Sequence, residues 1–327
     1  MKRSLILTLV LSLILAVLLP ASALAASIRV AVVQPLTHTS LNQIRDTILS
    51  ELENSGVAFE IVTRNAEGDS SALSTILENV KNEGVDILVP IATNTAQSAK
   101  MVFEDTGVPV VFAAVSDPVA AGLTGDDCGF ITGVSNNIPA AEIVRLISDF
   151  QPEYKKIGFL YTSSETNSVS TINAAKAYCD ANGIAYEEVS IANLSELQTA
   201  VETLISKGVD ALYTGNDNSI ASAMSTYIDV AYEYGIPVYC GADSMVADGG
   251  FATIGVDYVQ LGKQVAQIVV RLANGEYPEN IPYETLADYA KFVNLQAAER
   301  VGMEISDSIL ASYRVLVEAD GTSHFGE

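Results

Sequence analysis

The segment Val108-Pro109-Val110-Val111-Phe112-Ala113-Ala114-Val115-Ser116-Asp117-Pro118 decides the fold that the sequence predicts. Its first half is a short apolar run, typical of a strand buried on both faces of a parallel sheet. Its end, Ser116-Asp117-Pro118, carries residue types that begin helices. A buried strand that ends in small polar residues marks the edge where open α/β sheets bind ligands. We therefore predict a ligand cleft at this point of the chain.

Strand and helix patterns alternate along the chain before this segment. Apolar strand runs are expected at 28–33, 57–63 and 86–90, and helices at 41–54, at 70–82 and from the 92–95 loop to about 105. This order predicts a doubly wound parallel sheet, with the opening segment as its fourth strand. The next strand, 131–134, has no helix before it, so the chain is expected to leave this sheet for another.

The second half of the chain repeats the pattern. Helices expected at 140–150, 165–182, 194–207 and 217–234 alternate with strands at 156–161, 185–190, 210–213 and 237–240. Gly208-Val209-Asp210-Ala211-Leu212 also matches Gly84-Val85-Asp86-Ile87-Leu88, which indicates two similar halves. The predicted fold class is therefore α/β, with two Rossmann-like, doubly wound lobes joined by crossing strands.

Three crossing strands would divide the chain between these lobes. They are expected at 131–134, at 251–256 and at 281–285. Residues 26–133 and about 254–283 are assigned to lobe 1, and residues 134–253 and about 284–327 to lobe 2. Gly133 and Gly255 lie in two of the crossings, and we expect them to absorb a hinge motion that closes the lobes on a ligand.

The first 25 residues have the composition of an export signal. Met1-Lys2-Arg3 is basic, residues 5–19 are apolar, and Ala23-Leu24-Ala25 fits a cleavage site. This predicts a signal peptide cleaved near Ala25. The alternative is an uncleaved membrane anchor, although a spanning helix needs about 20 apolar residues. Because no cysteine follows the apolar run, there is no lipobox, and we expect an exported protein that is periplasmic or extracellular.

Composition argues against several classes of function. A formal net charge of −23 without a basic patch disfavours nucleic-acid binding. Two histidines, and three cysteines whose spacing fits no metal motif, predict no metal and no cofactor. Cys128, Cys179 and Cys240 leave two alternatives, a Cys179–Cys240 disulfide or buried free thiols. The sequence has no phosphate-binding glycine motif and no nucleophile elbow, which makes an enzyme the weaker alternative.

The loops that follow the strands carry candidate ligand-binding residues. Right-handed crossovers place these loops on one edge of each sheet. The loops are rich in Ser, Thr, Asn and Asp, and they contain almost no Lys or Arg. A ligand carboxylate would therefore be held by hydroxyls and helix N-terminal N–H groups, for which we choose Thr93, Thr95 and Ser116. The alternative role of each residue is an ordinary helix cap.

An amino-acid ligand also needs partners for its ammonium group and its side chain. For the ammonium we choose Asp217, with Asn167 and Glu165 as second candidates, because an unpaired buried charge is costly. Asp217→Asn is then expected to weaken binding about tenfold and to leave the fold intact, since Asn caps helices about as well as Asp. For the side chain we choose Tyr161 and Phe112. Their alternative role is to fill the core at the strand ends.

Several motifs together resemble one protein family. They are Ala92-Thr93 through Ala96-Gln97, Val115-Ser116-Asp117-Pro118 with Ala121-Gly122, Thr132-Gly133-Val134, Gly158 through Tyr161 with Glu165, Asn167 and Ser168, Asp217-Asn218, Gly255-Val256-Asp257-Tyr258, and His38 after the first strand. In these motifs the chain is similar to the substrate-binding proteins of ABC importers of the tryptophan/tyrosine type. It departs at Thr37 and Asn136, where acidic residues are common, and at Asp243, where Glu is common.

The resemblance implies a periplasmic-binding-protein fold of type I, a monomer, an aromatic or branched amino acid as ligand, and a membrane ABC permease as partner. Two other functions stay open: an exported enzyme with the same layout, such as a racemase or hydrolase, and a sensor subunit that presents the ligand to a receptor. The candidate ligand-binding residues are His38, Thr93, Asn94, Thr95, Phe112, Ser116, Asp117, Tyr161, Glu165, Asn167, Ser168, Asn216, Asp217 and Asp243.

Overall fold

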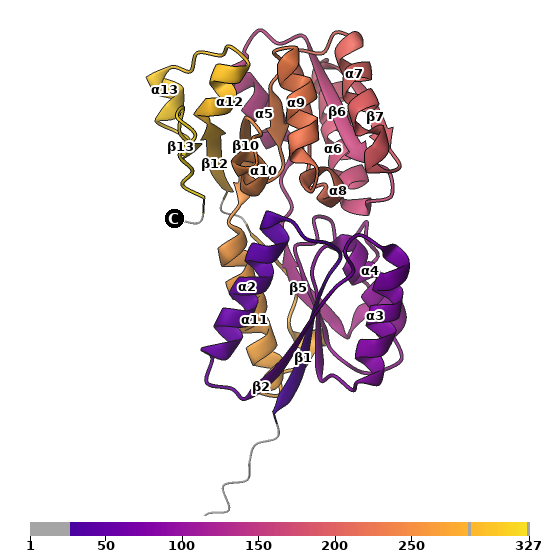
Figure 1. The fold of residues 1–327 in the computed structure, drawn as a ribbon. Helices are drawn as coiled ribbons and strands as arrows, with labels where there is room; N and C mark the ends of the chain where they lie inside the picture. The colour runs from indigo at the N-terminus through magenta and orange to yellow at the C-terminus, as the bar shows by residue number, and fades with distance from the viewer. Residues whose placement is uncertain (1–26, 287–288, 326–327) are drawn as a thin grey trace, which may run out of the picture.

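The computed structural model describes residues 27–286 and 289–325. Its strands form two sheets, and Figure 1 shows the two parts built on them stacked end to end, with helices packed around each sheet. We call the part built on the first sheet lobe 1 and the part built on the second sheet lobe 2. The predicted α/β class with two doubly wound lobes is confirmed.

The sheet of lobe 1 has the strand order β11-β5-β4-β3-β1-β2, and neighbouring strands are parallel. The strands are β1 (Ile28–Gln34), β2 (Phe59–Asn65), β3 (Ile87–Pro90), β4 (Val110–Ala113), β5 (Ile131–Ser135) and β11 (Glu284–Thr285). The helices of this lobe are α2 (Thr39–Glu53), α3 (Ser70–Asn82), α4 (Thr93–Phe103) and α11 (Tyr258–Ala273). Every residue of β3 and β4 is buried, as their uninterrupted apolar runs predict.

One helix of lobe 1 comes from far along the chain. α11 follows a strand of lobe 2 and packs beside α2, on the opposite side of the sheet from α3 and α4 (Figure 1). Gly262 permits this close approach, because a Cβ added there would lie 2.8 Å from the Cβ of Thr47. Tyr258, the first residue of α11, is thereby placed at the junction of the lobes.

The sheet of lobe 2 has the order β13-β12-β10-β9-β8-β6-β7, in which only the β10–β12 pair is antiparallel among the described strands. The strands are β6 (Lys156–Thr162), β7 (Ala185–Ile191), β8 (Ala211–Thr214), β9 (Val238–Cys240), β10 (Ala252–Val256), β12 (Tyr289–Asn294) and β13 (Arg314–Val317). The helices are α5 (Ala140–Phe150), α6 (Thr166–Asn182), α7 (Leu197–Ser206), α8 (Asn218–Ala221), α9 (Met224–Glu233), α10 (Asp243–Ala247), α12 (Leu295–Arg300) and α13 (Asp307–Leu310). Short 3₁₀ turns lie at Asp126–Cys128, Leu194–Glu196 and Pro278–Asn280.

Two details differ from the expected elements. The helix expected at 217–234 is two helices, α8 and α9, because the Ser222 hydroxyl donates to the Ser219 carbonyl (2.6 Å) and Ala223 leaves the helical conformation. The crossing strands β5, β10 and β11 end at residues 135, 256 and 285, within one residue of the expected strand ends at 134, 256 and 285. The lobe boundaries expected at 133, 253 and 283 therefore fall inside or just before these strands. Each strand completes its pairing with its own sheet before the chain passes to the other lobe.

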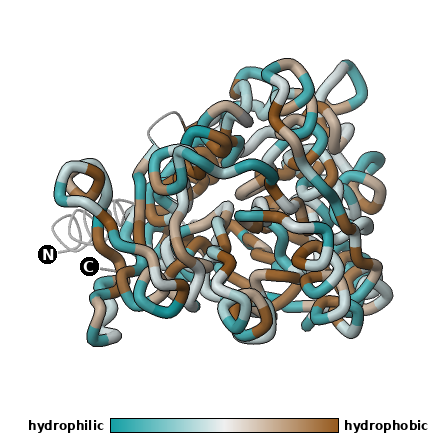
Figure 2. The backbone as a smooth tube through the Cα atoms, turned by 90° about the horizontal axis from the view of Figure 1, so that it is seen from above, coloured by the Kyte–Doolittle hydropathy of each residue, from teal (hydrophilic) through white to brown (hydrophobic). Residues whose placement is uncertain are grey.

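The interior of each lobe is apolar. Figure 2 shows hydrophobic segments running through the middle of the molecule and hydrophilic turns around its outside. The three cysteines are buried free thiols, so the second of the two alternatives holds. In residues 27–286 and 289–325, no helix has the length and apolar character to cross a membrane. The expected signal peptide lies outside the described residues.

Candidate functional site

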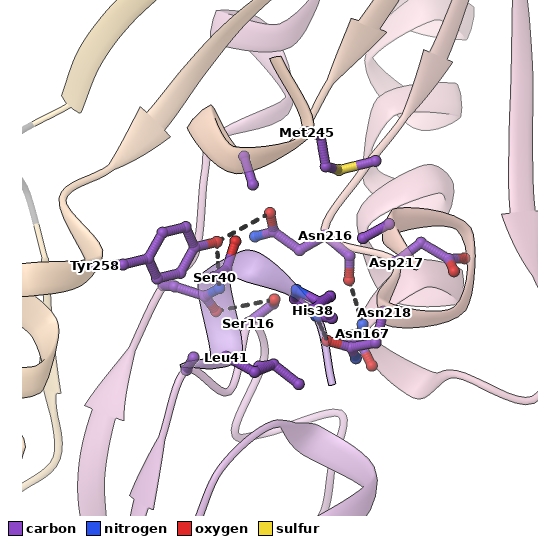
Figure 3. Close-up of a pocket in the computed structure, with 14 residues that line it drawn as sticks. His38, Ser40, Leu41, Ser116, Asn167, Asn216, Asp217, Asn218, Met245 and Tyr258 are labelled. Atoms are coloured by element: carbon purple, nitrogen blue, oxygen red, sulfur yellow. Dashed lines mark hydrogen bonds between the residues drawn. The ribbon is translucent and has the colours of Figure 1, made fainter. Parts of the chain in front are cut away.

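A small cavity lies between the lobes, where loops from the carboxyl ends of both sheets meet (Figure 3). Its volume is about 20 Å³. A space of this volume holds about one water molecule, so an amino acid can enter only when the lobes move apart. The cavity is lined by His38, Ser40, Leu41, Ala114, Ser116, Asn136, Asn167, Asn216, Asp217, Asn218, Ala221, Ala242, Met245 and Tyr258.

The backbone is strained at two neighbouring strand ends beside this cavity. Ala92, after β3, has φ +72° and ψ 159°, and Ala114, after β4, has φ +58°. Residues other than glycine rarely adopt positive φ, and such strain gathers at ligand sites. The Ala92 N–H donates to the Ala113 carbonyl (2.9 Å), which ties the two turns together. This geometry supports the predicted position of the cleft.

The three residues chosen for a carboxylate lie along this strained edge. Thr93 and Thr95 begin α4, and both are almost completely buried. No described residue forms a hydrogen bond with either hydroxyl. Ser116 lines the cavity and donates its hydroxyl to the Asn136 side-chain oxygen (3.0 Å). Of the three residues, only Ser116 belongs to the cavity wall; the two threonines lie at the neighbouring strand end.

Asp217, the residue predicted to bind the ligand ammonium, instead forms hydrogen bonds within lobe 2. Its carboxylate accepts hydrogen bonds from the N–H and hydroxyl of Thr162 (2.6 and 3.0 Å), the Ser168 hydroxyl (2.7 Å) and the Ile220 N–H (2.9 Å). All four donors belong to lobe 2, and Figure 3 shows the carboxylate turned away from the cavity. Burial and the nearby Glu165 charge raise the pKa of Asp217, against the effect of these donors. These four bonds join β6 and α6 to α8 and leave no lone pair of the carboxylate for an ammonium, so the predicted role of Asp217 is contradicted.

The Glu165 carboxylate is also occupied by hydrogen bonds from residues of lobe 2. Its carboxylate accepts from the N–H and hydroxyl of Ser219 (2.8 and 2.7 Å), the N–H and amide of Asn218 (2.9 and 2.7 Å) and the Asn167 amide (3.2 Å). The residue is 3% exposed. Two acids thus stabilise the first turn of the short helix α8, where free N–H groups favour negative charge.

The two aromatic residues chosen for the ligand side chain lie elsewhere. Phe112 is fully buried in the core of lobe 1, with its ring centroid 6.1 Å from that of Tyr283. The Tyr161 hydroxyl donates to Glu188 on β7 (3.2 Å). Side chains of a strand point to the two faces of its sheet, so these rings lie over the sheet faces, and neither lines the cavity at the sheet edge. The assignment was wrong for this reason, and the alternative role in the core applies to Phe112.

The apolar walls of the cavity come from residues that sequence reasoning missed. Leu41 in α2 and Met245 in α10 lie on opposite sides of the cavity, and Tyr258 closes a third side (Figure 3). Leu41 and Met245 are buried, and each follows a polar loop within the first turn of its helix. Their position after a polar loop was the only sequence feature that could have indicated a role in the cavity. In sequence, however, a leucine or methionine in a first helical turn looks the same as a core residue.

The remaining candidates have varied surroundings. Asn216 lines the cavity and accepts from the Tyr258 hydroxyl (3.4 Å), and Asp117 accepts from the Ser170 hydroxyl (2.6 Å). The Ser168 hydroxyl donates to the Asp217 carboxylate. Asn94 borders a second space, of about 540 Å³, between the lobes. Asp243 is buried beside the cavity, its carboxylate accepts the Ser244 N–H (2.7 Å), and burial raises its pKa to about 6.

Side-chain hydrogen bonds join the lobes around the cavity. They pair His38 with Asn218 (3.2 Å), Thr39 with Asp248 (3.3 Å), Ser40 with Ser244, Gln97 with Thr166 (3.2 Å), Asp117 with Ser170 (2.6 Å), and Tyr258 with Asn216 (3.4 Å). Each bond between neutral groups contributes about 0.5–1.5 kcal/mol, and a bond to a carboxylate about 1.5–3 kcal/mol. Within the described residues, lobe closure is therefore stabilised by several hydrogen bonds, none of which is part of an ion pair between the lobes.

Comparison with known proteins gives consistent results. Residues 29–316 match the family described as ABC transporter substrate binding protein. The tyrosine-binding protein of Clostridioides difficile is 28% identical over 282 residues, which cover 84% of this chain and 81% of that protein. A conserved domain protein of Vibrio cholerae has a TM-score of 0.84 at 31% identity, covering 88% of this chain and 99% of that one. A Streptococcus pneumoniae ABC domain in complex with L-Trp has a TM-score of 0.83 at 31% identity, covering 89% and 99%.

Proposed function

Because this chain belongs to the ABC transporter substrate-binding protein family, we propose that it binds an amino acid with an aromatic or branched side chain between its lobes. The observation that carries the proposal is the cavity, which has apolar walls from both lobes and a rim of neutral amides and hydroxyls. Two similar proteins, the tyrosine-binding protein and the L-Trp complex, support the same ligand class.

The apolar walls provide for the ligand side chain. Leu41 from lobe 1 and Met245 from lobe 2 face each other across the cavity (Figure 3). The small side chains of Ala221 and Ala242 also line it. Burying an apolar side chain contributes about 1.5–3 kcal/mol. Because the two walls belong to different lobes, a side chain between them also holds the lobes together.

The ligand carboxylate is assigned to the strained edge of lobe 1. The start of α4 offers backbone N–H groups together with the Thr93 and Thr95 hydroxyls, which have no hydrogen-bond partner among the described residues. Ser116 lies at the end of the neighbouring strand. A helix N-terminus favours negative charge without any arginine. Movement of the lobes would open this edge to the ligand.

We also propose the cellular setting. The protein is exported, with its signal peptide cleaved near Ala25, and acts as a monomer that passes its ligand to an ABC permease. An enzyme would instead convert the ligand. A sensor subunit would bind it equally well but would not support uptake by cells that carry the permease.

A thermal-shift panel tests the proposed ligand class. The mature protein is heated with each of the common L-amino acids and with sugars and polyols as comparison ligands. L-Tryptophan, L-tyrosine or L-leucine is expected to raise the melting temperature, because a ligand at 100 times its Kd stabilises the native state by about 2.7 kcal/mol. A shift with a sugar alone, or turnover of an amino acid without a shift, would contradict the proposal.

Met245→Ala should weaken binding of the tightest of these three amino acids about tenfold, with glycine and L-alanine much less affected. The change removes one apolar wall, and tenfold corresponds to about 1.4 kcal/mol. Met224→Ala is the matched control, because Met224 is an equally buried methionine in lobe 2 outside the cavity wall. Titration calorimetry measures both variants; equal losses of affinity would mean that Met245 acts only through stability.

A further inference from the structure

The position of Glu165 dictates how two neighbouring amides are oriented. An ionised carboxylate only accepts hydrogen bonds, and Glu165 accepts the backbone N–H groups of Asn218 and Ser219 and the Ser219 hydroxyl. The side-chain atoms of Asn167 and Asn218 that approach it, at 3.2 and 2.7 Å, must therefore be their NH₂ groups. The oxygen of each amide consequently points away from Glu165.

For Asn167 this leaves an acceptor without a donor. Its NH₂ group donates to Glu165 and to the Asn216 carbonyl oxygen. Its oxygen is buried, and no described residue donates to it. Asn167 is 3% exposed and lines the cavity.

The orientation of the Asn218 amide fixes which nitrogen of His38 carries the proton. The Asn218 oxygen lies 3.2 Å from His38 Nε2, and because that oxygen only accepts, Nε2 carries the proton. His38 Nδ1 is then a bare acceptor, and it too is buried without a partner among the described residues. Burial lowers the pKa of His38, which keeps the ring neutral at physiological pH.

Two residues that line the cavity thus each have a buried acceptor without a donor among the described residues. Figure 3 shows His38, Asn167 and Asn218 grouped opposite Tyr258. Leaving a buried acceptor unpaired is costly, so a bound molecule that donates to both atoms would be favoured. A single group that satisfies both must carry at least two N–H or O–H bonds. The nearby Glu165 charge favours a cation among such groups.

We propose that His38 Nδ1 and Asn167 Oδ1 bind the ammonium group of the ligand, and that Glu165 is the positioning residue that orients both. The proposal rests on the proposed amino-acid function and deepens it, because it makes the protein selective for a primary ammonium. A water molecule could also donate to both acceptors. In that case the site would contribute nothing to ligand selectivity.

The test compares matched ligands by titration calorimetry. L-Tryptophan, L-tyrosine or L-leucine, whichever binds most tightly, is compared with its 2-hydroxy acid and with its deamino acid. The wild-type protein is expected to prefer the amino acid by about 100-fold or more, because two charge-assisted hydrogen bonds are at stake. His38→Leu, Asn167→Leu and Glu165→Gln should each lower this ratio about tenfold or more. The Kd of the deamino acid should change much less.

Thr39→Val is the control, since it removes an interlobe hydrogen bond at the next residue of the chain. It should shift the Kd of all three ligands equally and leave the ratio unchanged. If the amino acid binds but the three variants keep the wild-type ratio, the ammonium site is refuted and the proposed function stands. If no amino acid binds to the wild-type protein, the proposed function fails and the ammonium site with it.

Discussion

Gly133→Ala is expected to destabilise the protein by about 3 kcal/mol or more. Gly133 lies in β5 with φ +154°, beside Phe112 of β4. A Cβ there would collide with the Phe112 carbonyl oxygen and lie 2.6 Å from two of its ring atoms. Both strands are central in the sheet of lobe 1, so neither backbone can shift without breaking its pairing. Urea denaturation monitored by circular dichroism measures the loss.

Gly255→Ala is the matched control for this prediction. A Cβ at Gly255 would meet its nearest atoms at 3.6–3.8 Å, which is ordinary contact. The variant should therefore change the free energy of unfolding by less than about 1 kcal/mol. If both variants cost the same, close packing against Phe112 is not what requires a glycine at 133. The hinge role expected for both glycines stays a prediction.

Asp217→Asn is expected to destabilise lobe 2 by about 2–4 kcal/mol. Whichever way the new amide is turned, its NH₂ group faces either the Thr162 N–H or the Ile220 N–H, and one buried donor loses its acceptor. This reverses the expectation from sequence that the fold stays intact. The loss is measured by chemical denaturation, followed by a probe in lobe 2.

The control is Asp69→Asn. The Asp69 side chain accepts from the N–H groups of Ser71 and Ala72 at the exposed start of α3. Asn caps a helix about as well as Asp, so this variant should lose only a few tenths of a kcal/mol. An equally small loss for Asp217→Asn would contradict the structural role assigned here to Asp217.

The fold could be predicted because it depends on local patterns. The apolar run of β4 and the restart of the strand and helix alternation after β5 gave the strand positions and the two lobes. The place of the cleft followed from the polar residues after β4. Such predictions need only periodicity and the rule that crossovers are right-handed, and both can be read from neighbouring residues.

The roles of individual side chains could not be predicted in the same way. Asp217 and Glu165 are both acids in loops at the cleft, but their carboxylates are used by donors of their own lobe. Such pairing depends on three-dimensional positions that no spacing in the sequence encodes. Leu41 and Met245 were not predicted as cavity residues for a related reason. They come from different lobes and face each other only when the lobes are in contact. His38 and Asn167 line the cavity, and their role in ligand binding stays a prediction. Their unpaired atoms could be identified only from the hydrogen bonds around Glu165.

The most direct test of the account is a crystal structure of the mature protein with the amino acid that binds most tightly. We expect one ligand per chain, with its side chain between Leu41 and Met245. Its ammonium nitrogen should lie within about 3.2 Å of His38 Nδ1 and Asn167 Oδ1. A ligand in the larger space bordered by Asn94, or one whose ammonium contacts Asp217 instead, would contradict the account.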